Sequence, residues 1–376
     1  MRRTFKYRLK ANKDTIQKTE EILNLCRQIY NLCLEQRIHH WKYYKKSISA
    51  ITQQNQLVEL KKVFPEYSKI PSQTLQDVVR RVDRAYQGFF RRVKKGDKAG
   101  FPRFKGYNRY DSFTLTQAGW KLQGNKLTIS KIGSFKVVLH RPIEGKIKTI
   151  TIRRTLTNKW FVCFACENVP TKPLPKTNKI IGIDMGCESF LTDSNGNRID
   201  NPRFLKRSEK ILTKRQQKLS SKKKGSHRRQ KAKMLVAKIH EKISNQRQDF
   251  HFKVANVLVK ENDIICIEKL NSWNTDWSCL NKSLRDVAWF NFFNCLKWKA
   301  EEATKEIIEV PAKDTSQLCS SCAKLVPKTL SDRIHKCPHC YLTIDRDLNS
   351  ALNILLLGTS SRGSGILPRE AKQIIA

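Results

Sequence analysis

Residues 319–349 read CSSCAKLVPKTLSDRIHKCPHCYLTIDRDLN, and most of what the sequence predicts starts from this stretch. It contains two cysteine doublets, Cys319-x-x-Cys322 and Cys337-x-x-Cys340, separated by fourteen residues. Each doublet places two thiolates on one tight turn, and two such turns supply the four soft ligands of a tetrahedral zinc site. We therefore predict a zinc ribbon over residues 315–342, in which Zn²⁺ has a structural role.

The redox compartment decides whether four such cysteines bind a metal or form disulfides. The sequence has no pattern typical of a signal peptide and no apolar run long enough to cross a membrane. We expect a cytoplasmic protein with no membrane partner. In that compartment thiols stay reduced, which favours a metal site over two disulfides.

The charge of the chain indicates its partner. Its 376 residues contain 74 Lys and Arg against 33 Asp and Glu, a net charge of +41. Self-repulsion of this size opposes compaction unless a polyanion neutralises it. A nucleic-acid duplex of about 20 base pairs carries about 40 phosphates, which is a comparable charge. The composition therefore predicts an extended nucleic-acid partner, whereas nothing in the sequence indicates an oligomeric state.

Two kinds of pattern alternate in the first half of the chain. Residues 1–10 and several short runs in 112–168 alternate apolar with polar side chains, which is typical of strands. We expect residues 1–10 and 112–170 to form a small β-barrel. Residues 11–111 instead have apolar side chains at helical spacing, from Lys13 and again behind Ser72. They predict a helical, basic insertion that recognises nucleic acid.

The second half, after a proline-rich linker, alternates buried strands with helices. Two apolar strands end in Asp184 and Glu268, and a last helix begins near Asp347. This order predicts an α/β domain over 177–314 and 343–357, into which the ribbon is inserted. Residues 358–376 are rich in Ser and Gly and are expected to be a disordered tail. The fold class is therefore α+β and multidomain.

Three acidic residues occupy comparable places in this domain: Asp184 and Glu268 at strand ends, and Asp347 where a helix opens. Taken alone, Asp345 or Asp347 is better explained as a helix cap. Asp184 directly follows a run of isoleucines, where a carboxylate is costly unless it is paired or metal-bound. Three acids at one sheet edge repel each other unless cations neutralise them, and oxygen ligands favour Mg²⁺ or Mn²⁺. This is the pattern of a two-metal phosphodiesterase site.

Residues 203–242 contain 16 Lys and Arg and two Glu, a net charge of +14. A solvated helix face normally balances its charges, so this excess favours contact with phosphates. The candidate contacts are Lys222, Lys223, Lys224, Arg228 and Arg229. The alternative is a solvated loop around Gly225 that touches nothing.

A set of motifs in this order resembles the TnpB (OrfB) family, whose members are encoded by bacterial insertion sequences and are related to compact type V CRISPR effectors. The C-terminal motifs are Gly182-Ile183-Asp184-Met185-Gly186, Ile267-Glu268-Lys269-Leu270, the two cysteine doublets, and Asp345-Arg346-Asp347-Leu348-Asn349-Ser350-Ala351. The N-terminal ones are Tyr7-Arg8-Leu9, Tyr30-Asn31-Leu32 and Phe101-Pro102-Arg103-Phe104-Lys105. The resemblance covers about residues 1–357. Cys187 and Ser350 depart from the family pattern, and neither departure removes a ligand.

The resemblance implies an RNase H-like (RuvC-type) nuclease domain, a guide RNA and a double-stranded DNA target cut beside a short element-adjacent motif. It also implies a bacterial or archaeal protein associated with the nucleoid. By the family pattern Asp184, Glu268 and Asp347 are the catalytic, metal-binding acids, with Asp345 as the fallback for the third. We therefore expect an RNA-guided DNA endonuclease. A catalytically silent RNA-guided regulator and a transposase acting on element ends are the alternatives.

Overall fold

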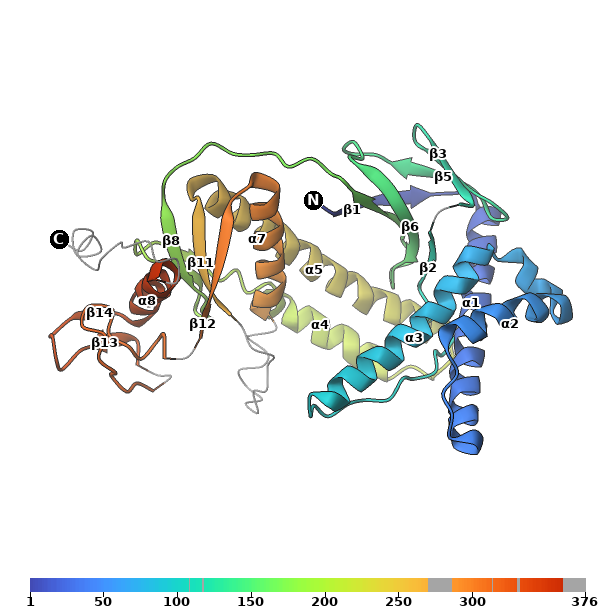
Figure 1. The fold of residues 1–376 in the computed structure, drawn as a ribbon, viewed down its shortest axis with the longest axis horizontal. Coiled ribbons are helices and arrows are strands. Elements are labelled where there is room, and N and C mark those ends of the chain that lie inside the picture. Colours follow the sequence, from blue (N-terminus) through green and yellow to red (C-terminus); the bar gives the residue numbers. More distant parts are fainter. Residues whose placement is uncertain (108, 117, 270–285, 313, 330–331, 361–376) are drawn as a thin grey trace. The chain divides into compact units, whose positions relative to one another are not determined.

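The computed structural model describes the chain except for residues 108, 117, 270–285, 313, 330–331 and 361–376 (Figure 1). The described chain forms two units, Met1–Pro170 and Thr171 onward, each with its own buried core. It is an α+β fold in which one unit contains a curled antiparallel sheet and the other a mixed sheet. The described part contains no helix with the length and apolar character that a membrane span requires.

The first unit consists of a sheet and a group of helices. Its helices are α1 (Lys13–Tyr44), α2 (Ala50–Val63) and α3 (Ser72–Lys94), with a 3₁₀ turn at Pro65–Lys69. Its strands are β1 (Arg3–Lys10), β2 (Ser112–Leu115), β3 (Trp120–Gln123), β4 (Lys126–Ile129), β5 (Gly133–Val138), β6 (Lys146–Arg154) and β7 (Trp160–Glu167). All pairings are antiparallel, in the order β2-β6-β7-β1-β5-β4-β3.

The N-terminal strand lies inside this sheet, between β7 and β5, as the alternation in residues 1–10 predicts. Strand pairing among the described residues ends at β2 on one side and β3 on the other, so the sheet curls but has two edges. The helices from Lys13 and from Ser72 are confirmed. Helix α2 was not predicted because it buries only Gln53 and Leu57, which leaves little apolar periodicity to detect.

The second unit is built on a five-stranded sheet. Its strands are β8 (Ile180–Asp184), β9 (Ser189–Asp193), β10 (Arg198–Asp200), β11 (Ile264–Lys269) and β12 (Glu306–Pro311), and a separate hairpin contains β13 (Ile334–Lys336) and β14 (Thr343–Asp345). Its helices are α4 (Phe204–Ser220), α5 (His227–Glu261), α7 (Trp289–Ala303) and α8 (Arg346–Ser360). The sheet order is β10-β9-β8-β11-β12, with β9 antiparallel to β8 and β10, and β11 parallel to β8 and β12.

Helices cover both faces of this sheet (Figure 1). Successive residues of a strand point to opposite faces, so β11 divides its side chains between two cores. Ile265 and Ile267 pack with α5 and α7, whereas Cys266 packs with Ile354 of α8. The near-continuous apolar runs of β8 and β11 follow from this two-sided burial.

Two predicted boundaries differ from the structure. Strand β14 pairs with β13, so the cysteine-containing hairpin extends to Asp345 and not only to residue 342. The tail was predicted to begin at 358, but Gly358, Thr359 and Ser360 are the last turn of α8. A side chain at Gly358 would overlap Cys266, so glycine at this position lets the helix end lie against β11. The rest of the predicted tail lies outside the described residues.

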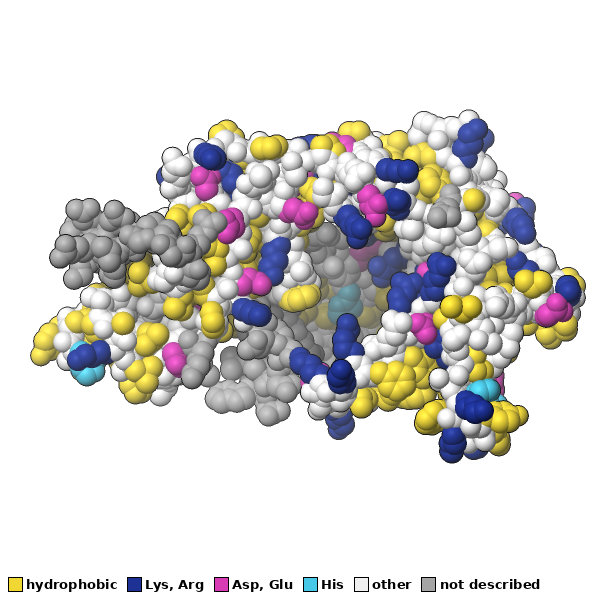
Figure 2. Space-filling view, in the orientation of Figure 1, with side chains coloured by type: hydrophobic (Ala, Val, Ile, Leu, Met, Phe, Trp, Pro, Cys, Tyr) yellow, Lys and Arg dark blue, Asp and Glu magenta, His cyan; other side chains and the backbone are white. Residues whose placement is uncertain are grey.

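Positive charge is spread over the face of the molecule that Figure 2 draws. On the face in Figure 2, Lys and Arg side chains lie over many elements and not in one patch. This distribution differs from that of a basic amphipathic helix at a membrane surface, which concentrates its charge on one face.

Candidate active site and metal centre

Asp184 and Glu268 lie at the same edge of the five-stranded sheet. Ile183 of β8 is in register with Ile267 of β11, and the two strands are parallel. The next residue of each strand is the acid, so Asp184 and Glu268 are neighbours at the carboxyl ends of adjacent strands. This edge is where sites form in open α/β sheets, because several strand ends and loops converge there.

Asp347 reaches this edge from α8, which packs directly on β8. A Cβ on Gly182 would lie 2.7 Å from the Leu355 nitrogen, so the absence of a side chain permits this close approach. Residues four apart share a helix face, which places Asp347 on the same side of α8 as Ala351 and Leu355. Asp347 Oδ2 lies 3.8 Å from the position that a Cβ on Gly186 would occupy. Its carboxylate is therefore beside the loop that directly follows Asp184.

The electrostatics of Asp184 reflect this convergence. Burial raises the pKa of Asp184 well above its usual value, and the negative charges of Glu268 and Asp347 raise it further. The positive charge of Arg346 and a hydrogen bond from the Met185 backbone act in the opposite direction. The charged form of Asp184 is therefore unfavourable here unless a cation compensates it.

Glu268 is held by a side chain outside its own strand. The hydroxyl of Thr315 donates a hydrogen bond to Glu268 Oε1. Burial raises the pKa of Glu268, and the hydrogen bond from Thr315 lowers it in part. Sequence reasoning did not identify Thr315, although it comes just four residues before Cys319.

Asp345 has a different environment from Asp347. Its Oδ1 accepts hydrogen bonds from the backbone N–H groups of Asp347, at 2.9 Å, and of Leu348, at 3.2 Å. Its Oδ2 forms an ion pair with Arg198 of β10. Asp345 thus caps the first turn of α8 and is already paired, which is the role that carboxylates commonly have at a helix N-terminus.

The three carboxylates suit a hard divalent cation. Carboxylate oxygens are the ligands that Mg²⁺ and Mn²⁺ prefer, and like charges at one sheet edge need such a cation to lie together. Among the described residues, only the four cysteines bring three or more candidate ligand atoms within 4.8 Å of one another. Asp184, Glu268 and Asp347 do not form such a group among the described residues.

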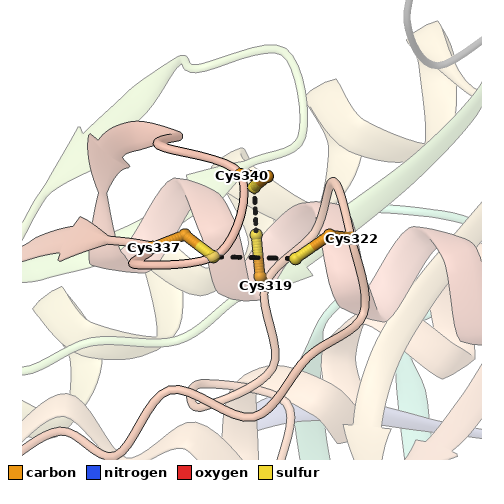
Figure 3. A group of neighbouring side chains, drawn as sticks. All are labelled: Cys319, Cys322, Cys337 and Cys340. Atoms are coloured by element: carbon orange, nitrogen blue, oxygen red, sulfur yellow. Dashed lines mark hydrogen bonds between the residues drawn. The ribbon is translucent and has the colours of Figure 1, made fainter.

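The four cysteines converge from two turns that precede α8 (Figure 3). Cys319 and Cys322 lie in a turn closed by the bridge between Leu318 and Leu325, and Cys337 and Cys340 lie in the turn of the β13–β14 hairpin. We call the two turns together the cysteine hairpin. Sγ of Cys319 lies 3.5 Å from Sγ of Cys340, and Sγ of Cys322 lies 3.6 Å from Sγ of Cys337. Four sulfurs at the Zn–S distance of about 2.3 Å in a tetrahedron are about 3.8 Å apart. The spacing of the thiols therefore fits a zinc ion, as the doublets predict.

The two doublets form equivalent turns. In each turn, the carbonyl of the first cysteine accepts a hydrogen bond from the backbone N–H four residues later. Ala323 donates to Cys319 at 2.9 Å, and Tyr341 donates to Cys337 at 3.0 Å. Ala323 and Tyr341 both have φ of 59°, in the left-handed region. Non-glycine residues are uncommon in this conformation, so the matching turns indicate a shared structural requirement.

The basic segment 203–242 contains all of α4, the turn that follows it and the first part of α5. Lys222, Lys223 and Lys224 lie in the turn between α4 and α5 and are exposed, as is Arg228. Arg229 is only half-exposed, and its guanidinium donates 2.8 Å hydrogen bonds to the carbonyls of Leu219 and Lys222. The turn is therefore held by Arg229 while the lysines project into solvent.

This architecture defines a class: a protein with acidic residues at the edge of a mixed sheet, a four-cysteine hairpin beside them and a strongly basic surface. Three family models match the chain. They are described as "Probable transposase" over residues 163–275, "Cas12f1-like, TNB domain" over 289–354 and "Helix-turn-helix domain" over 1–46. In this structure, residues 1–46 contain β1 and the single long helix α1.

The chain also resembles complete proteins. It is 31% identical to a Streptomyces pristinaespiralis protein named "Putative RNA-guided DNA endonuclease", over 98% of this chain and 93% of that one. It is 26% identical to "Putative RNA-guided DNA endonuclease InsQ" of Escherichia coli (strain K12), over 98% and 96%. The chain belongs to the TnpB (OrfB) family, as its motifs predict.

A solved structure has the same general fold. The Cas12f1 chain in a complex with sgRNA and target DNA superposes with a TM-score of 0.59 at 16% identity, covering 91% of this chain and 83% of that one. At this identity the likeness extends to the fold only.

Proposed function

We propose that this protein is an RNA-guided DNA endonuclease of a transposable element, which cleaves double-stranded DNA beside a short element-adjacent motif. Family membership and the names of its relatives support this activity. The structural observation that carries the proposal is the meeting of Asp184, Glu268 and Asp347 at one sheet edge. A silent relative would need none of these acids, whereas all three are present here, and the charges of Glu268 and Asp347 both act on Asp184.

The second unit is proposed to be an RNase H-like, RuvC-type nuclease domain. Three antiparallel strands, β10, β9 and β8, continue into two parallel ones, β11 and β12, and α8 crosses the central strands. This topology supports the assignment because it places the ends of β8 and β11 and the start of α8 together. The curled sheet and the helices of residues 11–111 are proposed to hold the guide RNA and the DNA.

Asp184, Glu268 and Asp347 are proposed to hold Mg²⁺ or Mn²⁺. Divalent cations bound by these residues would polarise the scissile phosphate and activate the attacking water. The chain's own contribution is positioning: β8 and β11 fix two carboxylates in register, and α8 brings the third. Arg346 adds positive charge next to them, since its guanidinium lies 3.4 Å from Asp347 Oδ1.

The four cysteines are proposed to hold a structural Zn²⁺, because four thiolates complete a tetrahedron and leave no position for substrate. The exposed lysines at 222–224 are proposed to contact nucleic-acid phosphates. The two relatives that align over nearly the whole chain are bacterial. Cleavage of chromosomal DNA would place the protein at the bacterial nucleoid.

Cleavage products provide the test. The protein is purified with its co-expressed guide RNA, the bound RNA is sequenced, and a plasmid with the matching target is incubated with Mg²⁺. The proposal expects double-strand breaks in the matched plasmid only, and none with Asp184→Asn. Binding without cleavage by the wild-type protein would indicate a regulator, and joined strands would indicate a transposase.

A further inference from the structure

The cysteine hairpin and the acidic site are connected by buried hydrogen bonds. Thr315 lies between β12 and the first cysteine doublet, and its side chain is buried. Strand β12 runs parallel to β11, and Val310 is in register with Glu268. The chain leaving β12 therefore crosses the end of β11, where the Thr315 hydroxyl donates to Glu268 Oε1.

A second connection joins the same segment to α8. Asn349 is fully buried, and its amide makes two hydrogen bonds to the first cysteine turn. Oδ1 accepts from the Ser320 N–H at 3.0 Å, and Nδ2 donates to the Leu318 carbonyl at 2.7 Å. Ser320 and Leu318 flank Cys319, so Asn349 holds the backbone on both sides of a cysteine of the cluster.

Asn353, one turn further along α8, repeats the contact. Its Nδ2 donates to the carbonyls of Thr315 and Leu318, both at 2.8 Å. Buried amides are costly when unpaired, so these bonds favour one arrangement of the segment against the helix. The backbone of Thr315 is thereby fixed by α8, while its hydroxyl is fixed on Glu268.

The geometry of α8 turns these contacts into a link between the sites. A helix advances 100° per residue, so Asn349 projects about 200° away from Asp347 around the axis. Asp347 therefore faces the strand that ends in Asp184, whereas Asn349 and Asn353 face the cysteine hairpin. The position of α8 therefore depends both on its packing against β8 and on the hydrogen bonds of Asn349 and Asn353 to the cysteine hairpin.

We propose that Thr315 is a positioning residue for Glu268, and that Asn349 and Asn353 make the zinc-bound hairpin part of the scaffold of the acidic site. This inference rests on the proposed function, since it concerns the carboxylates proposed to hold divalent cations. Zinc in the four cysteines orders the segment 315–320. That segment then orients Glu268 through the hydroxyl of Thr315. Through the two asparagines it also positions α8, the helix that contains Asp347.

The test compares two substitutions at Thr315. Thr315→Val removes the hydroxyl with little change in shape, and Thr315→Ser keeps it. Groups that orient ligating residues typically contribute about 10–100-fold to metal affinity or activity. Thr315→Val in the guide-loaded protein should raise the Mn²⁺ dissociation constant, measured by EPR, by about tenfold or more. Its cleavage rate at limiting Mg²⁺ should fall by a similar factor, and Thr315→Ser should restore both values.

Thr359→Val is the matched control. It removes another buried threonine hydroxyl of the same unit, at the far end of α8 from Asp347, where it bonds the helix carbonyls of Leu355 and Leu356. We expect it to leave Mn²⁺ affinity unchanged. Target-DNA affinity and zinc content should be unchanged in all three variants, which separates positioning from misfolding.

Asn349→Ala tests the link to the hairpin. With zinc still bound, it should weaken Mn²⁺ binding and slow cleavage by a factor similar to that of Thr315→Val. Unchanged Mn²⁺ affinity in both Thr315→Val and Asn349→Ala, or failure of Thr315→Ser to restore it, would overturn the inference. If Asp184→Asn also leaves cleavage intact, the proposed function has failed. If Asp184→Asn is inactive while Thr315→Val and Asn349→Ala both match the wild type, only the inference has failed.

Discussion

The backbone N–H of Asp347 donates a 2.9 Å hydrogen bond to the side chain of Asp345, so the two acids of one short motif have different roles. The carboxylate of Asp345 accepts hydrogen bonds from the first turn of α8 and forms an ion pair with Arg198. Asp347 projects from the helix toward the end of β8. The hydrogen bonding of Asp345 therefore favours Asp347 as the third ligand, and we propose that assignment.

This difference predicts opposite results for two matched substitutions. Asp347→Asn should reduce guided cleavage at least about a hundredfold, because a metal ligand contributes several kcal/mol to the rate. Asp345→Asn keeps a capping oxygen and loses a half-exposed ion pair that contributes about 0–1 kcal/mol, so cleavage should persist. Single-turnover rates and target binding measure both. Full cleavage by Asp347→Asn would transfer the third ligand to Asp345.

The raised pKa of Asp184 predicts how stability depends on pH without Mg²⁺ or Mn²⁺. A carboxyl whose pKa is higher in the folded state binds more protons there, so folding is favoured at low pH. With its zinc retained and no Mg²⁺ or Mn²⁺ added, the wild type should lose stability as the pH rises through the folded-state pKa of Asp184. Asp184→Asn should lack this loss. Urea denaturation of both proteins between pH 5 and pH 8 measures the difference, and parallel curves would contradict the prediction.

The cysteine cluster predicts that the two metals can be removed separately. Cys322→Ser or Cys340→Ser should lose zinc and lower the midpoint of thermal unfolding, because structural zinc contributes folding energy directly. Cleavage should fall as well. Cys295→Ser, at a half-buried cysteine of α7, is the control and should retain zinc. Elemental analysis measures the zinc, and a folded, active wild-type protein without zinc would refute the site.

The turn between α4 and α5 predicts different effects for neighbouring cations. Replacing Lys222, Lys223 and Lys224 with Ala should weaken nucleic-acid binding uniformly across sequences. The slope of log affinity against log salt should become shallower by roughly 0.9 per lost duplex-phosphate contact. An unchanged slope would favour the solvated loop that the sequence leaves as an alternative.

Arg229→Ala provides the contrast in the same turn. It removes two hydrogen bonds that hold the turn, at a cost of about 1–3 kcal/mol in unfolding free energy. The salt slope should change less than in the lysine variant, since the guanidinium is engaged with carbonyls. A larger change in slope for Arg229→Ala would assign the phosphate contact to this residue.

The packing of α8 predicts opposite effects for two helical glycines. Gly358→Ala would force a methyl group into Cys266 and should destabilise the protein by about 1–3 kcal/mol, the usual cost of overpacking. Gly88→Ala in α3 meets only the end of Arg92, at 3.8 Å, and should stabilise by about 0.5–1 kcal/mol. Chemical denaturation measures both, and equal effects would contradict the close approach of α8 to β11.

The features that the sequence predicts are those encoded over short distances. Two thiolates on one tight turn require only the C-x-x-C spacing, so the cysteine cluster could be inferred without a structure. Apolar runs ending in Asp184 and Glu268 mark the ends of buried strands, because burial on both faces removes polar residues from the strand. Helices with several buried apolar side chains, such as α1 and α3, were likewise detectable. Helix α2, with two buried residues, was not.

The features that only the tertiary structure decided are contacts between residues far apart in the chain. Thr315 bonds Glu268 across 47 residues, and Asn353 bonds Leu318 across 35. Neither contact has a periodic signal, because a hydrogen bond depends on where the backbone brings two polar groups and not on their spacing in sequence. The same holds for Arg198 and Asp345. The residue types of the site therefore indicate its chemistry from the sequence alone. The relative positions of its carboxylates depend on how β11, the cysteine hairpin and α8 pack together.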